Sequence, residues 1–256
     1  MTAIPNLAGA RRKSRLYVEL ATTIDDIRAS QALRYKVFAG EMGAQLKGDT
    51  ETLDQDHFDP FCQHLLVKES ATGRVIASTR LLLGEQARKA GGFYSESEFE
   101  MKALYDLPGR SVEVGRTCVD PSYRQGAAIA VLWSGLADFI HQFEIDHLFG
   151  CASIEMADGG VLTQAIMNNV RQQAMVDEAW RVTPRNPLKP LPPGAEQTVS
   201  APLPPLLKAY FRLGARACGE PCYDPDFDCA DILVLVDVSE INASYARHFL
   251  DRVSRE

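Results

Sequence analysis

The stretch that most constrains the fold runs from residue 112 to residue 133 and reads VEVGRTCVDPSYRQGAAIAVLW. Strand-forming residues fill its first part, residues 120–123 break the run, and apolar residues then recur at helical spacing over residues 129–140. The pattern predicts a strand, a short turn and a long helix. Small residues where that helix begins leave backbone amides accessible, and a helix N-terminus favours an anion. The alternative is an ordinary turn whose small residues serve packing.

Length and charge indicate one large domain that is not a nucleic-acid binder. The chain has 256 residues, 46% of them hydrophobic, and a net charge of -7, which allows a substantial core and disfavours general binding to a phosphate backbone. We expect a flexible basic tail over residues 1–15 and a single domain over residues 16–256, with a Pro-rich internal loop over residues 184–205.

Cysteine usage and hydropathy bear on the compartment. The six cysteines show no paired metal-binding spacing, so we expect a reducing compartment and no metal, with Cys218, Cys222 and Cys229 as the residual alternative for a metal or a disulfide. No apolar run reaches membrane-spanning length and the N-terminus lacks a signal-peptide core, which predicts a cytoplasmic protein. The basic tail is either solvated or a transient contact with the surface of the inner membrane.

Periodicity along the rest of the chain alternates between the strand and helix patterns. Strands are expected at residues 16–20, 64–68, 74–83, 112–119, 146–154 and 230–238, with one more beginning at 180–182. The first helix is expected to begin at residue 24 and to end near Gly40 or Gly43. Further helices are expected at residues 98–105, 125–140, 158–173, 206–217 and 242–253, and a loop at 84–96. Strands that meet in one sheet while helices flank it give an α+β protein.

Charged residues in unusual places are the first candidates for a site. Arg80 lies inside the apolar run STRLLL and should meet a carboxylate or face a cavity. Arg34 and Phe38 are one helical turn apart and share a face. The acidic loop GDTETLDQDHFDP, which contains Asp54 and Asp59, is either solvated or a cluster that holds a substrate ammonium group.

Segments spread over most of residues 33–250 together resemble one branch of the GCN5-related N-acetyltransferase superfamily, the ornithine N-alpha-acyltransferases of ornithine-lipid synthesis. They are LRYKVFAGEMGA, LDQDHFDPFCQHLLV, STRLLL, VEVGRTCVDPSYRQGAAIAVLW, LFGCASIE, PPLLKAYFRLGARACGEPCYDPDFDCADILVLVDV and YARHFL. The resemblance implies a mixed, mostly antiparallel sheet flanked by helices, with splayed central strands. It also implies transfer of a 3-hydroxyacyl group from acyl carrier protein to the alpha-amine of ornithine, with no permanently bound cofactor.

A sparser similarity to acyl-homoserine lactone synthases rests on Arg34, Phe38, Asp54, Asp59, Arg80, Glu113 and Arg116. The tryptophan usual in that family after the phenylalanine is missing here, and the carboxy-terminal third is longer. Two enzymatic alternatives therefore stay open, a lactone synthase and an acetyl-CoA-dependent N-acetyltransferase. A third is a non-enzymatic member whose pocket binds a lipid or a partner.

Acyl transfer to an amine needs a base, and Glu113 is the candidate. Burial in an apolar strand should raise its pKa unless the carboxylate is paired, and a raised pKa suits the task. The alternative is a structural ion pair with Arg116 or Arg80. Residues 113 and 116 point to opposite faces of a regular strand, so we predict a bulge at Gly115 that brings them to one side.

The remaining roles follow from the two resemblances. A backbone amide near Cys118 or Val119 would hold the oxyanion, and both Cys118 and Cys151 read as buried thiols rather than nucleophiles. Arg124 with the amides of Gly126, Ala127 and Ala128 would bind the phosphopantetheine phosphate, although this run is one residue shorter than the usual acyl-carrier loop.

For the acceptor, Arg34 and Arg80 would bind the amino-acid carboxylate or shape the pocket through Asp54 and Asp59, and those two aspartates could receive the side-chain ammonium. Ser153 is a further candidate for substrate binding. The acyl tail would lie between strands 112–119 and 146–154, where Phe38, Trp133 and Phe149 are either lining or plain core.

Overall fold

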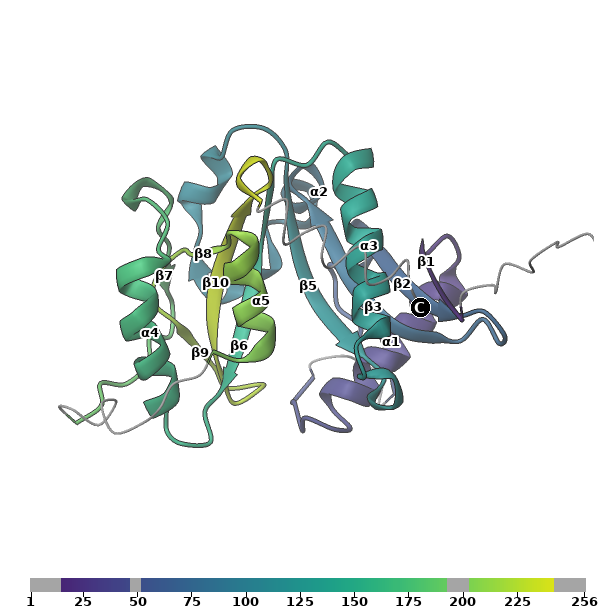
Figure 1. Ribbon diagram of the computed structural model, residues 1–256, viewed down its shortest axis with the longest axis horizontal. Helices are drawn as coiled ribbons and strands as arrows, with labels where there is room; N and C mark the ends of the chain where they lie inside the picture. The colour runs from purple at the N-terminus through teal and green to yellow at the C-terminus, as the bar shows by residue number, and fades with distance from the viewer. Residues whose placement is uncertain (1–14, 47–51, 193–202, 242–256) are drawn as a thin grey trace, which may run out of the picture.

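The computed structural model describes residues 15–46, 52–192 and 203–241, which form a twisted sheet with helices on both faces (Figure 1). The sheet has eight strands in the order β1-β2-β3-β5-β6-β10-β8, and β9 pairs with β10. Its strands are β1 (Leu16–Leu20), β2 (Gln63–Glu69), β3 (Val75–Leu83), β5 (Ser111–Val119), β6 (His147–Glu155), β8 (Arg216–Ala217), β9 (Cys222–Asp224) and β10 (Cys229–Asp237). The helices are α1 (Ile24–Phe38), α2 (Gly84–Ala90), α3 (Ala127–Gln142), α4 (Val161–Gln173) and α5 (Pro205–Leu213).

Two layers of helices cover the sheet. On β2, Leu65 and Val67 pack with α3, whereas Leu66 between them packs with α1, because successive side chains of a strand point to opposite faces. The same alternation on β10 sends Ile232 toward α4 and α5 and Leu233 toward α2. Helices α3, α4 and α5 therefore share one face, and α1 and α2 share the other.

The centre of the sheet is held by a short parallel contact between β5 and β6. All the other strand pairs of this sheet are antiparallel, but β5 and β6 run parallel and pair only at residues 111–113 with 147–149. Figure 1 shows the two strands separating toward their carboxyl ends. The predicted splay of the central strands is confirmed.

Several expected elements differ from the structure. Residues 84–96 contain α2 and the 3-10 helix η2 (Tyr94–Ser97) instead of a loop. The helix expected at 98–105 is replaced by β4 (Phe99–Glu100), which pairs with β7 (Thr183–Pro184), and by the 3-10 helix η3 (Lys102–Asp106). Burial explains the first change, since Gly84 and Ala87 are enclosed, and pairing with a distant segment explains the second.

The carboxy-terminal third also needs corrections. Helix α5 ends at Leu213 because Gly214 takes a left-handed conformation (φ 109), so the helix does not reach residue 217 as predicted. The strand expected to begin at 180–182 starts at Thr183, after the 3-10 helix η5 (Glu178–Trp180). The helix expected at 242–253 lies outside the described residues, as does nearly all of the basic tail. No helix among the described residues is both long and apolar enough to span a bilayer.

Candidate active site

A bulge in β5 organises the polar side of the site. Arg80 on β3 pairs with Gly115, but Ser78 pairs with Cys118, so β5 has one more residue than β3 over this interval. Arg116 within the bulge has a left-handed backbone, with φ 51. The bulge predicted at Gly115 is confirmed, with Arg116 carrying the unusual conformation, and it turns Glu113 and Arg116 toward the face covered by α1 and α2.

Glu113 is enclosed and fully hydrogen-bonded. Its carboxylate accepts hydrogen bonds from the amide of Tyr94 at 2.7 Å, the amide of Ser95 at 2.8 Å and the hydroxyl of Ser95 at 2.6 Å. The residue is 3% exposed, and burial raises its pKa although the three donors oppose the shift. Within the described chain it forms no ion pair with Arg116 or Arg80, and it lines neither of the cavities described below. Its carboxylate fixes η2 to the sheet.

Beside Glu113 lies a buried network of arginines and aspartates. Nε of Arg34 donates to Asp54 at 2.8 Å, and one Nη donates to both oxygens of Asp59 at 3.0 and 3.1 Å. Arg80 donates to Asp56 at 2.7 Å and to Asp59 at 3.1 Å. Within the described part of the acidic loop, residues 52–60, Asp54, Asp56 and Asp59 thus hold the chain onto α1 and β3 instead of facing solvent.

The network pairs each of its carboxylates with a guanidinium group. Burial alone would raise the pKa of Asp59, but the guanidinium groups of Arg34 and Arg80 outweigh it and hold that pKa below its usual value. Arg34 is only 1% exposed. It and Arg80 therefore shape the pocket through aspartates, which is one of the two roles expected for them. Neither guanidinium lines either of the two cavities described below.

Beside this network lies a cavity of about 580 Å³ that several acidic side chains line, here called the acidic cavity. Asp54, Asp56 and Arg116 form one wall, with Nε of Arg116 3.2 Å from Asp54. The guanidinium of Arg116 also lies over the ring of Tyr94, 4.7 Å from its centroid. The opposite wall contains Glu98, Tyr223, Asp224, Asp226 and Phe227. Phe38 lies behind that region, edge-on to Phe227 at 5.6 Å, and does not line the acyl path suggested for it.

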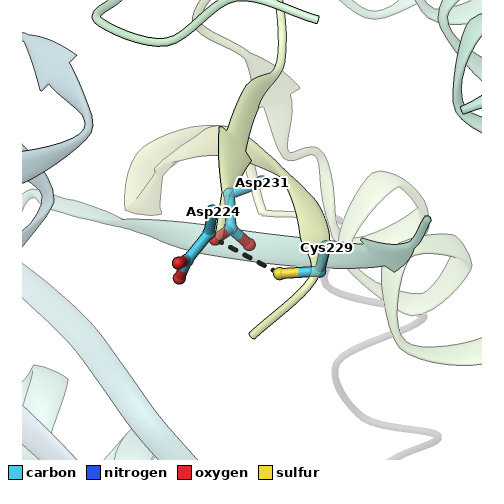
Figure 2. A group of neighbouring side chains, drawn as sticks. All are labelled: Asp224, Cys229 and Asp231. Carbon is cyan, nitrogen blue, oxygen red and sulfur yellow. Dashed lines mark hydrogen bonds between the residues drawn. The ribbon is translucent and has the colours of Figure 1, made fainter. Parts of the chain in front are cut away.

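The acidic wall was not found by sequence reasoning. Figure 2 shows Asp224, Cys229 and Asp231 gathered at the β9–β10 hairpin, where one ligand-type atom of each lies within 4.8 Å of the others. Asp231 accepts a hydrogen bond from Ser153 at 2.5 Å and from the Cys229 thiol at 3.7 Å. Burial, together with the carboxylates of Asp231 and Asp224, raises the pKa of Glu98 to about 9. The available signal was Asp231 itself, a charge inside the apolar run ADILVLVDV.

The second cavity, the apolar cavity, lies on the other face of the sheet, has a volume of about 160 Å³ and is lined almost entirely by carbon. Helices α3 and α5 contribute Trp133, Leu136 and Tyr210, and the rings of Trp133 and Tyr210 stack with centroids 5.5 Å apart. Val114 and Phe149 line it from the diverging strands. The expected position of Trp133 and Phe149 beside the splay agrees with this cavity.

Cys151 on β6 lies between the apolar cavity and a residue of the acidic cavity. It lines the apolar cavity, and its Sγ donates to Oε2 of Glu98, which lines the acidic cavity, at 3.6 Å. Its Sγ also lies 3.4 Å from the hydroxyl of Ser95, which donates to Glu113. Burial raises the pKa of the Cys151 thiol well above its usual value, so the group is a neutral thiol rather than a nucleophile.

The predicted phosphate site lies at the start of α3. Gly126 is the N-cap with φ 108, and no side chain caps the helix. Gly126 and Ala127 are exposed, whereas Ala128 is buried. Nε of Arg124 donates to the carbonyl of Val119 at 3.2 Å. The two Nη atoms of Arg124 form a bidentate ion pair with the carboxylate of Glu41, and the distance from Nη2 to Oε2 is 2.8 Å. Cys118 lies apart from this group, buried against α1 beside Ser78.

A sheet whose central parallel strands part beside an uncapped helix defines an acyltransferase of the GNAT class, and comparisons agree. The family described as acetyltransferase (GNAT) domain matches residues 33–134. A CoA-dependent acyl-homoserine lactone synthase, BjaI, superimposes with a TM-score of 0.58 at 14% identity, covering 94% of this chain and 89% of that one. FeeM, an N-acyl amino acid synthase from uncultured soil microbes, gives a TM-score of 0.51 at 11% identity, covering 94% and 98%.

Sequence relatives narrow the class. The chain is 34% identical to an L-ornithine N(alpha)-acyltransferase of Rhizobium meliloti over 93% of this chain and 85% of the relative. It is 32% identical to an enzyme of the same name from Brucella abortus over 93% and 90%. The chain belongs to the L-ornithine N(alpha)-acyltransferase family, and the expected fold and acyltransferase class are confirmed.

Proposed function

We propose that this protein moves a 3-hydroxyacyl group from acyl carrier protein to the alpha-amine of L-ornithine and so forms lyso-ornithine lipid. The names of the relatives support ornithine as the acceptor. The observation that carries the proposal is the pair of unlike cavities that meet at Cys151. One is suited to a hydrocarbon chain and the other to a charged amino acid, which are the two halves of the product.

In this reaction the amino acid lies in the acidic cavity with its carboxylate toward Arg116. A guanidinium that is already desolvated and held by Asp54 and Tyr94 binds a carboxylate strongly. The alpha-amine then points through the gap toward Cys151, where the thioester carbonyl arrives from the apolar side. This arrangement places nucleophile and thioester on either side of one narrow opening.

The amine must lose one proton before it attacks. We assign Glu113 as the final acceptor, reached through Cys151 and Ser95. The Cys151 thiol turns its hydrogen from Glu98 to the Ser95 oxygen 3.4 Å away. The ammonium proton then passes to the sulfur, the thiol proton to the serine oxygen and the serine proton to Glu113. The free amine then forms the C–N bond and the C–S bond breaks. The pantetheine thiolate leaves with the second amine proton.

The donor end of the proposal rests on the start of α3. Its exposed amides at Gly126 and Ala127, with the nearby guanidinium of Arg124, favour one phosphate group. A carrier-bound pantetheine presents a single phosphodiester, whereas coenzyme A presents a pyrophosphate. The shortened run Arg124-Gln125-Gly126-Ala127-Ala128 therefore supports a carrier-protein donor.

The test is a donor comparison with the purified full chain. L-ornithine is incubated with 3-hydroxyacyl carrier protein, the matching 3-hydroxyacyl-CoA or acetyl-CoA, and the amide product is measured by mass spectrometry. We expect N-acylornithine at the highest kcat/KM with the carrier donor. A preference for either CoA donor would overturn the donor assignment, and absence of N-acylornithine with every donor would overturn the function. A parallel reaction with S-adenosylmethionine in place of ornithine tests the alternative of a lactone synthase, which would form an acyl-homoserine lactone.

A further inference from the structure

Glu98 and Asp224 line one wall of the acidic cavity, and Asp231 is buried behind Glu98, to which it hydrogen-bonds. Within the described residues, none of these three carboxyl groups forms an ion pair with a lysine, arginine or histidine. The opposite wall differs, because Asp54 and Asp56 contact Arg34, Arg116 and Arg80. The same cavity thus has one set of carboxylates that is paired with arginines and a second set, called the unmatched group, that is not.

The unmatched group is held rigidly in place. Asp231 projects from the long strand β10 and is 4% exposed, with its oxygens fixed by Ser153 and Cys229. Glu98 hydrogen-bonds to Asp231 and accepts from Cys151. Such a group does not relax toward solvent as surface carboxylates do, so its mutual repulsion is relieved only by a proton or by a bound cation.

The other end of the cavity identifies what kind of cation fits. Nε of Arg116 is buried and makes no hydrogen bond, although Asp54 lies within ion-pair distance, and the residue lines the cavity. A ligand with a carboxylate at one end and an ammonium at the other matches both walls at once. A neutral amino acid would match only the arginine side.

We propose that Glu98 and Asp224, with the buried charge of Asp231 behind Glu98, bind the side-chain ammonium of the acceptor and make the enzyme selective for a diamino acid. This inference rests on the proposed function and assigns the acceptor specificity within it. It replaces Asp54 and Asp59 as the site for that ammonium, because the guanidinium groups already match those two aspartates.

A divalent metal ion is the competing ligand for the same atoms. Burial and the adjacent Asp231 raise the pKa of the Cys229 thiol, which therefore stays protonated and donates to Asp231 instead of offering a thiolate. An ammonium group needs only hydrogen-bond acceptors. Glu98 and Asp231 share one proton and still offer carboxyl oxygens as acceptors.

The test compares L-ornithine with L-norvaline, which lacks only the side-chain amine, in wild-type protein and in Asp224→Asn, Glu98→Gln and Asp231→Asn. We expect wild type to favour ornithine, and the variants to lower the ornithine-to-norvaline ratio of kcat/KM at least about ten-fold with little change for norvaline. Glu100→Gln is the matched control, because this nearby acid is exposed and outside the cavity. An unchanged ratio in all three variants would overturn the inference.

Two further measurements on the wild-type protein complete the test. Calorimetric binding to the wild type needs no folded variant, and equal affinity for ornithine and norvaline would also overturn the inference. Loss of ornithine selectivity after treatment with EDTA would assign the site to a metal and overturn it as well. If the wild type makes N-acylornithine but none of the substitutions changes the ornithine-to-norvaline ratio, only this inference fails. If the wild type makes no N-acylornithine, the proposed function fails.

Discussion

A methyl group at Gly150 would lie 2.2 Å from the carbonyl oxygen of Val114. Gly150 is the first β6 residue after the parallel pairing with β5 ends. Because it has no side chain, the β5 carbonyl can turn toward β6 at the point where the two strands begin to separate. The opening proposed between the two cavities thus lies where the fold needs a glycine for close backbone approach rather than for a left-handed conformation.

Gly150→Ala should widen or distort this opening and lower turnover at least about ten-fold, because a misplacement of about 1 Å at a reacting centre has that effect. The free energy of unfolding should fall by about 1–3 kcal/mol through overpacking. Gly115→Ala is the control, since no atom lies within 4 Å of the added carbon. Steady-state kinetics with thermal unfolding measure both effects, and equal activity of the two variants would contradict the role given to Gly150.

Arg34→Met should be strongly destabilising. The substitution removes a fully buried cation and leaves Asp54 and Asp59 short of a partner, which costs about 3–5 kcal/mol. Arg171→Met is the control, because its pair with Glu220 is on the surface and contributes less than about 1 kcal/mol. Urea unfolding measures the difference; similar losses in both variants would mean that the buried network does not stabilise the fold.

The assigned proton route predicts a dependence of rate on pH. Burial raises the pKa of Glu113 above 4.5, and only the ionised form accepts a proton, so the rate should fall as the pH drops through that raised pKa. Ser95→Ala removes both the relay hydroxyl and a donor to the carboxylate, so it should lower turnover and move the acid limb of the remaining activity to higher pH. Glu113→Gln should abolish that limb. A purely structural Glu113 would instead give variants with lower melting temperatures and an unchanged profile.

Arg124→Ala should raise the apparent KM for the acylated carrier by about three- to ten-fold and leave that for ornithine unchanged, because only a charge-assisted contact to phosphate is lost. Glu41→Ala provides the opposite test. It frees Arg124 from its carboxylate partner and should lower the carrier KM. Kinetics at low and high salt measure both, and an unaltered carrier KM in Arg124→Ala would refute the phosphate site.

Leu136→Phe should narrow the choice of acyl donor. Leu136 lines the apolar cavity, so a larger side chain should lower the ratio of kcat/KM for long-chain to short-chain acyl carriers by about ten-fold or more. Leu206→Phe on α5 is the control, since Leu206 is 42% exposed and outside the cavity. An identical chain-length profile in the two variants would exclude the apolar cavity as the acyl site.

Much of the fold was predictable because long strands and amphipathic helices have clear periods. The bulge was predictable too, since Glu113 and Arg116 are an odd number apart and had to share one face. A charge within an apolar run correctly marked Arg80 as a residue that meets carboxylates. Asp231 is also a charged residue within an apolar run, and it too lies at the candidate site.

The acidic wall was out of reach for a different reason. Glu98 lies in a segment that looked helical, and its neighbours Cys151 and Asp231 are distant along the chain. Only the pairing of β10 with β6 and the docking of η2 on Glu113 bring these residues together. Sequence periodicity describes which face a residue takes on its own element and contains no information on which distant elements meet there.

The location of the two cavities on opposite faces of the sheet sets the kinetic order of the proposed reaction. The acylated carrier and the amino acid occupy separate compartments, so neither has to depart before the other is loaded. Both substrates are therefore present together when the amide forms, and the catalytic cycle passes through a ternary complex rather than a substituted-enzyme, ping-pong sequence.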